Sequence, residues 1–176
     1  APIKQESGMY KIFIDGQAGT TGLQIHERLQ DRADLEILAI SDAERKDPKT
    51  KRQIIEAADI VILCLPDDAA RETVQLAPSN KARFIDASTA HRIHPDWVYG
   101  LPELSNTQRS QIQSARFVSN PGCYPTGFLL AIAPLVEQGL IKPSSPIGIS
   151  AVSGYSGGGR QMMEQYQQRN VDHPDD

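Results

Sequence analysis

The sequence has little of what several protein classes require. Its 176 residues include only two cysteines, Cys64 and Cys123, too few for a disulfide framework, so each is expected to be a free thiol. The longest apolar runs, Ile60 to Leu65 and Phe128 to Val136, fall far short of the roughly 20 residues that a transmembrane helix needs. The net charge is −4, the basic residues are scattered, and no group of His, Cys, Asp and Glu has metal-site spacing. We therefore expect a cytoplasmic protein with no metal, no membrane anchor and no nucleic-acid partner.

Short β-branched runs alternate with longer amphipathic stretches over most of the chain. This pattern is typical of βαβ units around a parallel sheet that is covered on both faces. It predicts an α/β fold, a Rossmann-like doubly wound parallel sheet, over residues 9–122. The expected strands are Tyr10–Asp15, Leu35–Ile40, Ile60–Leu65, Arg83–Asp86 and Arg116–Ser119. The expected helices are Thr21–Gln30, Lys51–Ala57, Ala69–Leu76 and Ser105–Ser114.

The two ends of the chain differ from this pattern. Residues 1–8 show neither strand nor helix periodicity, so we expect a leader or tag there. Residues 123–176 are expected to begin an α+β catalytic domain that the chain contains incompletely. In this part an apolar helix is expected as far as Gln138, with Gly139 as its C′ residue, and a strand is expected over Pro146–Val152.

A glycine-rich turn directly follows the first expected strand. Gly16, Gly19 and Gly22 have the spacing G-x-x-G-x-x-G and open an amphipathic helix. Glycine permits a positive φ and lets the backbone approach a phosphate, while the helix N-terminus offers free N–H groups and the positive end of its dipole. The arrangement predicts a pyrophosphate site for a dinucleotide. The spacing differs from the commoner G-x-G-x-x-G, and a turn that binds no ligand is the alternative.

The second expected strand ends about 20 residues beyond the last glycine, where residues that read the adenosine ribose belong. Asp42 would accept hydrogen bonds from a ribose diol and would repel a 2′-phosphate. Ser41, Arg45 and Lys46 would instead bind that phosphate through a hydroxyl and two cations. The cations favour NADPH as the cofactor, and the alternative is a solvated charged loop.

The segment from Asn120 to Thr126 is the most informative in the chain. Proline and glycine turn the chain after a strand, and Cys123 then stands at or near the start of the next helix. A helix N-terminus favours a thiolate, so Cys123 is predicted to be a nucleophile. Cys64 lies in an apolar strand and is interpreted as a small buried hydrophobe. A nucleophilic thiol paired with a nicotinamide site indicates hydride transfer at the level of a thioester or thiohemiacetal.

Four motifs stand in order along the chain. They are Asp-Gly-Gln-Ala-Gly-Thr-Thr-Gly at 15–22, Tyr-Gly-Leu-Pro-Glu-Leu at 99–104, the cysteine motif at 120–126 and Ser-Gly-Tyr-Ser-Gly-Gly-Gly-Arg at 153–160. Together they resemble the N-acetyl-γ-glutamyl-phosphate reductase family, in its shorter, type 2 branch. The resemblance implies NADPH-dependent reduction of N-acetyl-γ-glutamyl phosphate to N-acetylglutamate semialdehyde and phosphate, in arginine biosynthesis. It also implies an oxidoreductase that is a homo-oligomer, a dimer or a tetramer.

The resemblance assigns roles to single residues. Cys123 would displace phosphate from the acyl phosphate and hold a thioester, beside an oxyanion hole of backbone N–H groups. The cofactor would be held by Gly16, Gly19, Thr20, Thr21, Gly22, Ser41, Arg45 and Asn120. Substrate would be bound by Arg92, Ser153, Gly154 and Arg160, where Arg92 falls in a segment similar to the family's Ser-Ala-Asp-Phe-Arg stretch. For Arg92 an exposed loop arginine is the alternative.

One part of the family's machinery is missing. The acid/base histidine of the family lies in a His-x-His-x-Pro-Glu segment downstream of the Arg160 motif, and no such segment occurs here. His173 lacks the paired histidine and the spacing. We therefore expect this chain alone to turn over little or nothing. Two alternatives stay open: an aspartate-semialdehyde dehydrogenase-like enzyme, and a non-catalytic dinucleotide-binding module.

Overall fold

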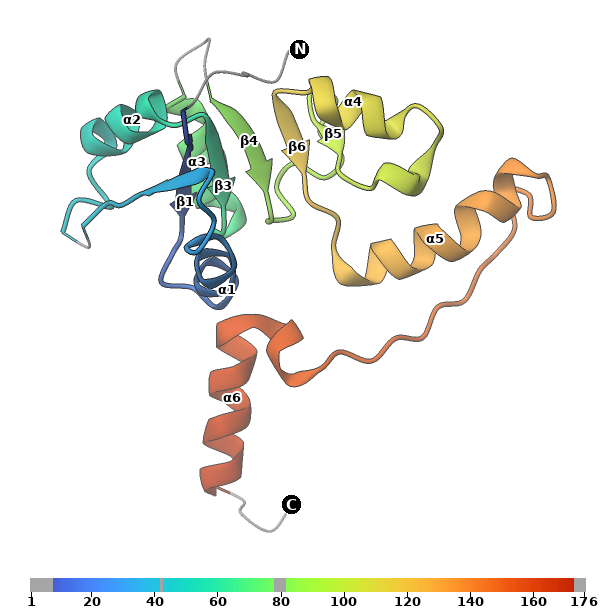
Figure 1. Ribbon diagram of the computed structural model, residues 1–176. Coiled ribbons are helices and arrows are strands. Elements are labelled where there is room, and N and C mark those ends of the chain that lie inside the picture. The colour runs from blue at the N-terminus through green and yellow to red at the C-terminus, as the bar shows by residue number, and fades with distance from the viewer. Residues whose placement is uncertain (1–7, 42, 78–81, 173–176) are drawn as a thin grey trace. The chain divides into compact units, whose positions relative to one another are not determined.

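The structure is a computed structural model that describes residues 8–41, 43–77 and 82–172 (Figure 1). The chain divides into two compact units, the first ending at Ile141 and the second beginning at Lys142. Each unit is described by itself below, and the predicted domain boundary at Cys123 stays a prediction. Within the described ranges no helix combines the length and the apolar character needed to cross a membrane.

The first unit is built on a parallel sheet, as predicted. Its six described strands are β1 (Tyr10–Asp15), β2 (Leu35–Leu38), β3 (Ile60–Leu63), β4 (Arg83–Asp86), β5 (Val98–Tyr99) and β6 (Phe117–Ser119). They lie in the order β2-β1-β3-β4-β6-β5, and every neighbouring pair is parallel. The chain leaves β1 for β2 on one side and returns to β3 on the other. The carboxyl ends of β1 and β3 therefore form a topological switch point, where open α/β sheets bind ligands.

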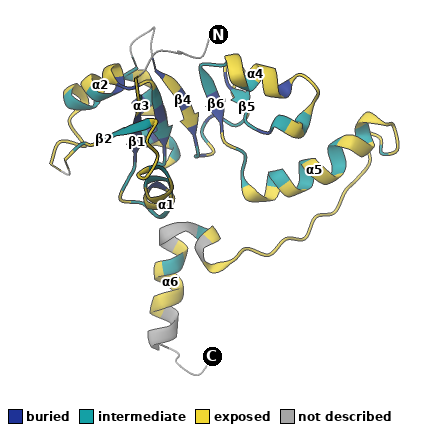
Figure 2. Cartoon of the chain, viewed as in Figure 1, coloured by how far each residue is buried: buried dark blue, intermediate teal, exposed yellow. Residues whose placement is uncertain are grey.

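Helices flank this sheet and enclose its core (Figure 2). They are α1 (Thr20–Leu29), α2 (Pro48–Ala57), α3 (Asp67–Gln75), α4 (Gln108–Ser114) and the short 3-10 turn η1 (Pro102–Leu104). Phe13, Val61 and Phe84 come from three adjacent strands and are fully buried with Ile55 of α2. Each such side chain contributes about 1.5 to 3 kcal/mol through burial, so the centre of the sheet is the rigid platform of the unit.

Helix α2 begins earlier than the expected start at Lys51. Asp47 is its N-cap, and its carboxylate accepts hydrogen bonds from the backbone N–H and the hydroxyl of Thr50 at 2.9 and 2.6 Å. Hydrogen bonds from Thr50 and the backbone hold the pKa of Asp47 below its usual value. Pro48 at the first helical position has a fixed φ that suits a helix start. Capping chemistry, rather than apolar periodicity, sets this boundary.

Two strand predictions need correction. The sequence analysis missed β5, an edge strand that pairs with β6, because its two residues are too few to show a period. It placed a strand over Pro146–Val152, which is wrong: these residues form no strand. A strand needs a neighbour for its backbone N–H and C=O groups, and none of the described strands pairs with this segment.

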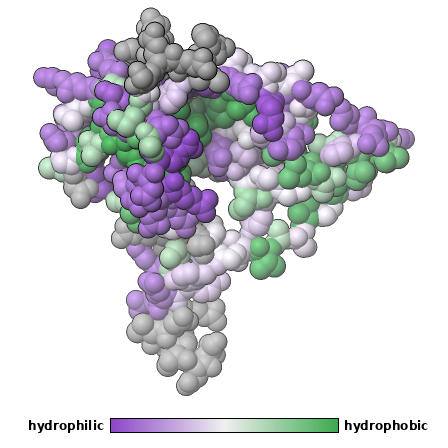
Figure 3. All heavy atoms as spheres, in the orientation of Figure 1, coloured by the Kyte–Doolittle hydropathy of each residue, from purple (hydrophilic) through white to green (hydrophobic). Residues whose placement is uncertain are grey.

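The long helix after the cysteine motif has the predicted form. Helix α5 runs over Cys123–Glu137, and Gly139, whose φ is +72°, is its C′ residue. The N–H of Leu140 donates to the carbonyl of Leu135 at 2.9 Å and that of Gly139 to Val136 at 3.0 Å, which is a Schellman motif. No described residue of α5 is buried, and its apolar side chains, such as those of Leu130 and Leu135, remain accessible (Figure 3). In the second unit, the turn η2 (Tyr155–Gly158) leads into α6 (Gly159–Asp172).

Candidate active site

The turn between β1 and α1 is packed so tightly that only glycine fits. Gly16 has a φ of +96°, and a Cβ there would lie 2.2 Å from the carbonyl oxygen of Cys64. A Cβ on Gly22 would lie 2.2 Å from the carbonyl oxygen of Gly16. These contacts lock the turn against the end of β3 and hold the first turn of α1 close to it. Packing alone therefore requires glycine at these two positions, whether or not a ligand binds.

The N-terminus of α1 is arranged to receive an anion. Gly19 is the N-cap and provides no side chain to cap the helix, and no acidic residue occupies the first turn. The first turn consists of Thr20, Thr21 and Gly22, whose backbone N–H groups point along the helix axis toward the turn. Backbone donors and the helix dipole together favour a phosphate at this position. The turn therefore fits the pyrophosphate of a dinucleotide.

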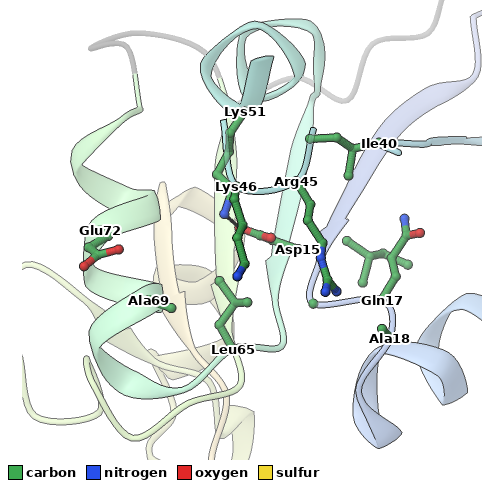
Figure 4. A pocket seen from close by; sticks show the side chains of 12 residues that line it. Asp15, Gln17, Ala18, Ile40, Arg45, Lys46, Lys51, Leu65, Ala69 and Glu72 are labelled. Carbon is green, nitrogen blue, oxygen red and sulfur yellow. Dashed lines mark ion pairs between the residues drawn. The ribbon is translucent and has the colours of Figure 1, made fainter. Parts of the chain in front are cut away.

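A pocket of about 500 Å³ opens beside this turn, at the switch point of the sheet (Figure 4). It is lined by Ile14, Asp15, Gly16, Gln17, Ala18, Ile40, Arg45, Lys46, Lys51, Leu65, Ala69 and Glu72. The side chains of Arg45 and Lys46 extend into it from the loop between β2 and α2. A volume in this range and a lining of apolar walls with a few cations suit a nucleotide.

Of the residues predicted to bind the adenosine end of the cofactor, the structure brings some to the pocket and not others. Arg45 and Lys46 line the pocket with Gly16. Ser41 does not line it, and its hydroxyl donates to the carboxylate of Glu44 on the same loop. Asp42, the alternative ribose ligand, lies outside the described residues. The pocket therefore presents the two cations that the sequence analysis favoured for a 2′-phosphate.

The cysteine motif lies at the end of β6, away from the residues that line the pocket. Cys123 is exposed and is the first residue of α5, with Gly122 as the N-cap. The carbonyl of Gly122 accepts hydrogen bonds from the backbone and the hydroxyl of Thr126, at 3.0 and 2.8 Å. The thiol thus stands at the positive end of a fifteen-residue helix, as predicted. Asn120 belongs to this turn and not to the pocket lining.

Arg92 is the predicted substrate residue that the structure brings to the cysteine. A Cβ on Gly122 would lie 2.6 Å from an Nη atom of Arg92, so the guanidinium occupies the space that a larger residue would fill. The guanidinium also donates to the carbonyl of Asn120 at 3.3 Å and, at 3.4 Å, to that of Ala87. A fixed positive charge therefore adjoins the backbone at Cys123.

A buried polar network supports the segment that carries Arg92. Asp86 is fully buried at the end of β4 and accepts hydrogen bonds from the backbone and the hydroxyl of Ser88 at 2.9 and 2.8 Å. Its other contact is Nδ1 of His91, at 2.6 Å. The ring of His91 stacks on Trp97 with 4.1 Å between centroids. His91 is thus a structural residue beneath the site, and the sequence analysis had no signal for its partner.

Cys64 has surroundings opposite to those of Cys123. It follows β3 directly, and burial together with the charges of Asp15 and Asp86 raises the pKa of its thiol to about 11. At neutral pH it is a protonated thiol, which is a poor nucleophile. The interpretation of Cys64 as an unreactive side chain agrees with this, but the prediction that it is buried within the strand is wrong, because Cys64 is half-buried and lies just after β3.

The remaining predicted substrate residues lie in the second unit. The hydroxyl of Ser153 donates to the carbonyl of Gly154 at 3.3 Å. Arg160 lies at the start of α6, and this unit is described without reference to the first. Their role at the substrate site therefore stays a prediction. His173 lies outside the described residues.

Sequence reasoning also missed a part of the pocket. Asp15 and Lys51 form an ion pair in its wall, and Thr73 donates a hydrogen bond to the same carboxylate. The one signal in the sequence was an aspartate at the end of an otherwise apolar strand. Its partners could not be read from spacing, because they come from two other elements of the fold.

This chain matches family models of semialdehyde dehydrogenase domains and solved structures of semialdehyde dehydrogenases. Residues 39–115 match the family model described as the semialdehyde dehydrogenase NAD binding domain, and residues 123–174 match the semialdehyde dehydrogenase dimerisation domain. The first match confirms a nicotinamide dinucleotide as the cofactor. Among solved structures, aspartate semialdehyde dehydrogenase II from Vibrio cholerae aligns with a TM-score of 0.65 at 17% identity, over 94% of this chain and 52% of that one. The Francisella tularensis aspartate semialdehyde dehydrogenase aligns with a TM-score of 0.65 at 19% identity, over 93% and 50%. These structures share the fold.

Relatives with higher identity share more than the fold. The N-acetyl-gamma-glutamyl-phosphate reductase of Trichormus variabilis is 55% identical over 156 residues, which are 89% of this chain and 48% of that protein. That of Brucella ovis is 54% identical over 166 residues, or 94% and 53%. The chain thus spans about half the length of the curated relatives it matches. Over that half, the chain belongs to the N-acetyl-γ-glutamyl-phosphate reductases, a family with the Rossmann-like fold of the semialdehyde dehydrogenases.

Proposed function

We propose that this chain is the cofactor-binding and nucleophile-bearing part of an NADPH-dependent acyl-phosphate reductase. Its substrate is N-acetyl-γ-glutamyl phosphate, and its products are N-acetylglutamate semialdehyde and phosphate, in arginine biosynthesis. The observation that carries the proposal is the identity of 54 to 55%, over 89 to 94% of the chain, to proteins named for this reductase. The pocket at the glycine turn and the exposed thiol at the start of α5 support it independently.

In the first half of the proposed reaction, Cys123 acts as the nucleophile. Its thiolate forms a bond to the acyl carbon, and the bond from that carbon to the phosphate oxygen breaks, so that phosphate leaves with the electron pair. The backbone N–H groups in the first turn of α5 have no intrahelical partners and can stabilise the oxyanion. Arg92, held against Gly122, offsets the negative charge of the leaving phosphate.

In the second half, the thioester on Cys123 is reduced and released. A nicotinamide cofactor held at the glycine turn and by Arg45 and Lys46 would supply the hydride for this step. A thioester suits the reaction because its carbonyl is more electrophilic than that of an ester or amide. When the carbon–sulfur bond breaks, the aldehyde leaves and the thiolate of Cys123 is restored at the helix N-terminus, which stabilises it.

The proposed cofactor is NADPH rather than NADH. Arg45 and Lys46 both line the pocket, which gives a 2′-phosphate two cations from one loop. Arginine binds phosphate with a planar fork of donors, and lysine adds a point charge. Gly16, Gly19, Thr20, Thr21 and Gly22 are proposed to hold the pyrophosphate, whereas Ser41 and Asn120 do not line the pocket.

The alternative activity is that of an aspartate-semialdehyde dehydrogenase, an enzyme whose solved structures share the fold of this chain. The two activities are separated by measuring phosphate-dependent NADP⁺ reduction by the full-length protein, with N-acetylglutamate semialdehyde and with aspartate semialdehyde. We expect a higher kcat/KM for the N-acetylated aldehyde. Preference for aspartate semialdehyde would overturn the proposed substrate.

The nucleophile is tested with a matched pair of cysteine variants. Cys123→Ser in the full-length protein is expected to abolish turnover and acyl-enzyme formation, while NADPH binding stays within a few fold of the wild type. Cys64→Ser is the control and is expected to keep turnover, because that thiol is half-buried and, with a pKa of about 11, protonated at neutral pH. Turnover retained by Cys123→Ser would refute the nucleophile. A protein that binds NADPH but reduces neither substrate would support the non-catalytic module instead.

The proposed assembly is a homo-oligomer, a dimer or a tetramer. Its support is the match of residues 123–174 to the semialdehyde dehydrogenase dimerisation domain. Light scattering on the full-length protein measures the mass directly, and a monomer at micromolar concentration would contradict the proposal.

A further inference from the structure

The wall of the cofactor pocket contains a buried ion pair that no step of the proposed reaction uses. Nζ of Lys51 lies 2.9 Å from Oδ2 of Asp15, and the two side chains are 15% and 7% exposed. The hydroxyl of Thr73 donates to the same Oδ2 at 2.9 Å. Figure 4 shows the pair as a dashed line at the back of the pocket, behind the cations of the loop.

These three residues come from the three elements that frame the pocket. Asp15 is the last residue of β1, immediately before the glycine turn. Lys51 lies in the first turns of α2, the helix that follows the loop carrying Arg45 and Lys46. Thr73 is buried in α3. The ion pair therefore fixes the start of α2, and the cationic loop before it, relative to the strand that ends at Gly16.

The ion pair also offsets a negative charge that would weaken phosphate binding in the pocket. A buried carboxylate at Asp15 stands beside the turn where the pyrophosphate is proposed to bind. In a partly desolvated site, a negative charge near phosphates weakens their binding strongly, since Coulomb energies grow as the effective dielectric constant falls. Thr73 supplies only a neutral hydrogen bond. Lys51 is thus the cation that cancels this charge.

Lys51 is arranged to act on Asp15 rather than on the cofactor. Its Nζ is 2.9 Å from the carboxylate and 3.4 Å from the Thr73 hydroxyl, which themselves are hydrogen-bonded, so it is directed at a pair of protein groups. Arg45 and Lys46, on the loop, are the cations that extend into the open pocket. The two sets of cations therefore have separate tasks.

We propose that Lys51 is a positioning residue of the cofactor site, which neutralises Asp15 and anchors the cationic loop without binding the dinucleotide itself. The inference rests on the proposed nicotinamide-binding function. It assigns Lys51 a role for both NADPH and NADH, because the charge that it cancels faces the pyrophosphate that these cofactors share.

The test is a charge-compensation cycle in the full-length protein. Dissociation constants for NADPH and NADH are measured by nicotinamide fluorescence for the wild type, Lys51→Met, Asp15→Asn and the double variant. Lys51→Met is expected to raise both constants by about tenfold or more and by similar factors, since it leaves a buried carboxylate unpaired. Asp15→Asn is expected to stay within about threefold of the wild type, and the double variant within about threefold of Asp15→Asn. Arg52→Met, which removes an exposed cation from the same helix, is the matched control and is expected to change neither constant.

Three results would overturn the inference. They are unchanged binding by Lys51→Met, weakening confined to NADPH, and a double variant that binds tenfold worse than Asp15→Asn; the last two would make Lys51 a direct ligand. If Lys51→Met fails to fold, the double variant still shows whether Lys51 binds the cofactor directly, because it buries no unpaired charge and is expected to fold. A wild-type protein that binds neither cofactor would end the proposed function instead. Urea unfolding of the four proteins would then still show whether Asp15 and Lys51 are coupled, and additive effects would reject the pair.

Discussion

The substitution Gly22→Ala tests whether the glycine turn is a packed cofactor cradle. A Cβ at this position would lie 2.2 Å from the carbonyl oxygen of Gly16 and 2.9 Å from Cα of Gln17. Both neighbours are backbone atoms, so they cannot rotate away as the end of a flexible side chain does. The turn and the first residues of α1 must move apart until the shortest contact reaches at least about 3.0 Å.

The magnitude follows from two opposing terms. Overpacking of a tight contact costs about 1 to 3 kcal/mol, and a clash with backbone belongs at the upper end. Alanine returns up to about 1 kcal/mol, because glycine is a poor helix former. We therefore expect Gly22→Ala to lower the free energy of unfolding by about 1 to 2 kcal/mol. We also expect it to weaken NADPH binding by about tenfold or more, since 1.4 kcal/mol corresponds to a factor of ten.

The assay combines urea unfolding without cofactor and NADPH titration by fluorescence, both on the full-length protein. Gly127→Ala is the matched control. Gly127 lies within α5, and a Cβ there would meet nothing within 4 Å. Gly127→Ala is expected to leave the NADPH affinity unchanged and to stabilise the protein by about 0.5 to 1 kcal/mol through helix propensity. A Gly22→Ala protein with the stability and NADPH affinity of the wild type would refute the argument from packing.

Two further predictions concern the cations and the cysteines. Arg45→Ala should weaken NADPH more than NADH, because a charge-assisted contact to the 2′-phosphate is worth about 1.5 to 3 kcal/mol; equal weakening of both would place the phosphate elsewhere. Alkylation by iodoacetamide at pH 8, followed by mass spectrometry, should modify Cys123 and spare Cys64, whose pKa of about 11 leaves roughly one thiol in a thousand ionised at that pH. Cys64 should become reactive only as the pH approaches 11, and its modification at pH 8 in folded protein would contradict the assigned surroundings.

Local chemistry made much of the fold and of the site predictable. The strand–glycine–helix order around Gly16 and the turn before Cys123 depend on neighbours in sequence, and the structure has both. The central strands were predictable because they are short, mostly apolar runs rich in β-branched residues and bounded by turn residues. By contrast, the extended segment 146–152 has the composition of a strand but no described partner, and composition does not reveal a partner.

Contacts between distant segments were beyond sequence reasoning. Asp15 and Lys51 are brought together only because α2 packs against β1. Gly122 looks like an ordinary turn residue, yet its missing side chain makes room for Arg92, which lies thirty residues earlier and on another strand's loop. Such residues show no period and no motif. They become visible only when the sheet order is known.

The same sheet order explains why the two cysteines differ. Asp15 ends β1 and Asp86 ends β4, and both are in register with Leu63, the last residue of the strand between them. Cys64 follows Leu63 and therefore lies between two buried carboxylates, which together with burial suppress its ionisation. Each carboxylate has its own partners, Lys51 and Thr73 for one and Ser88 and His91 for the other, so neither is free to serve a reacting thiol. The proposed nucleophile, Cys123, has different surroundings: it is exposed at the N-terminus of α5, and the guanidinium of Arg92 lies against its neighbour Gly122.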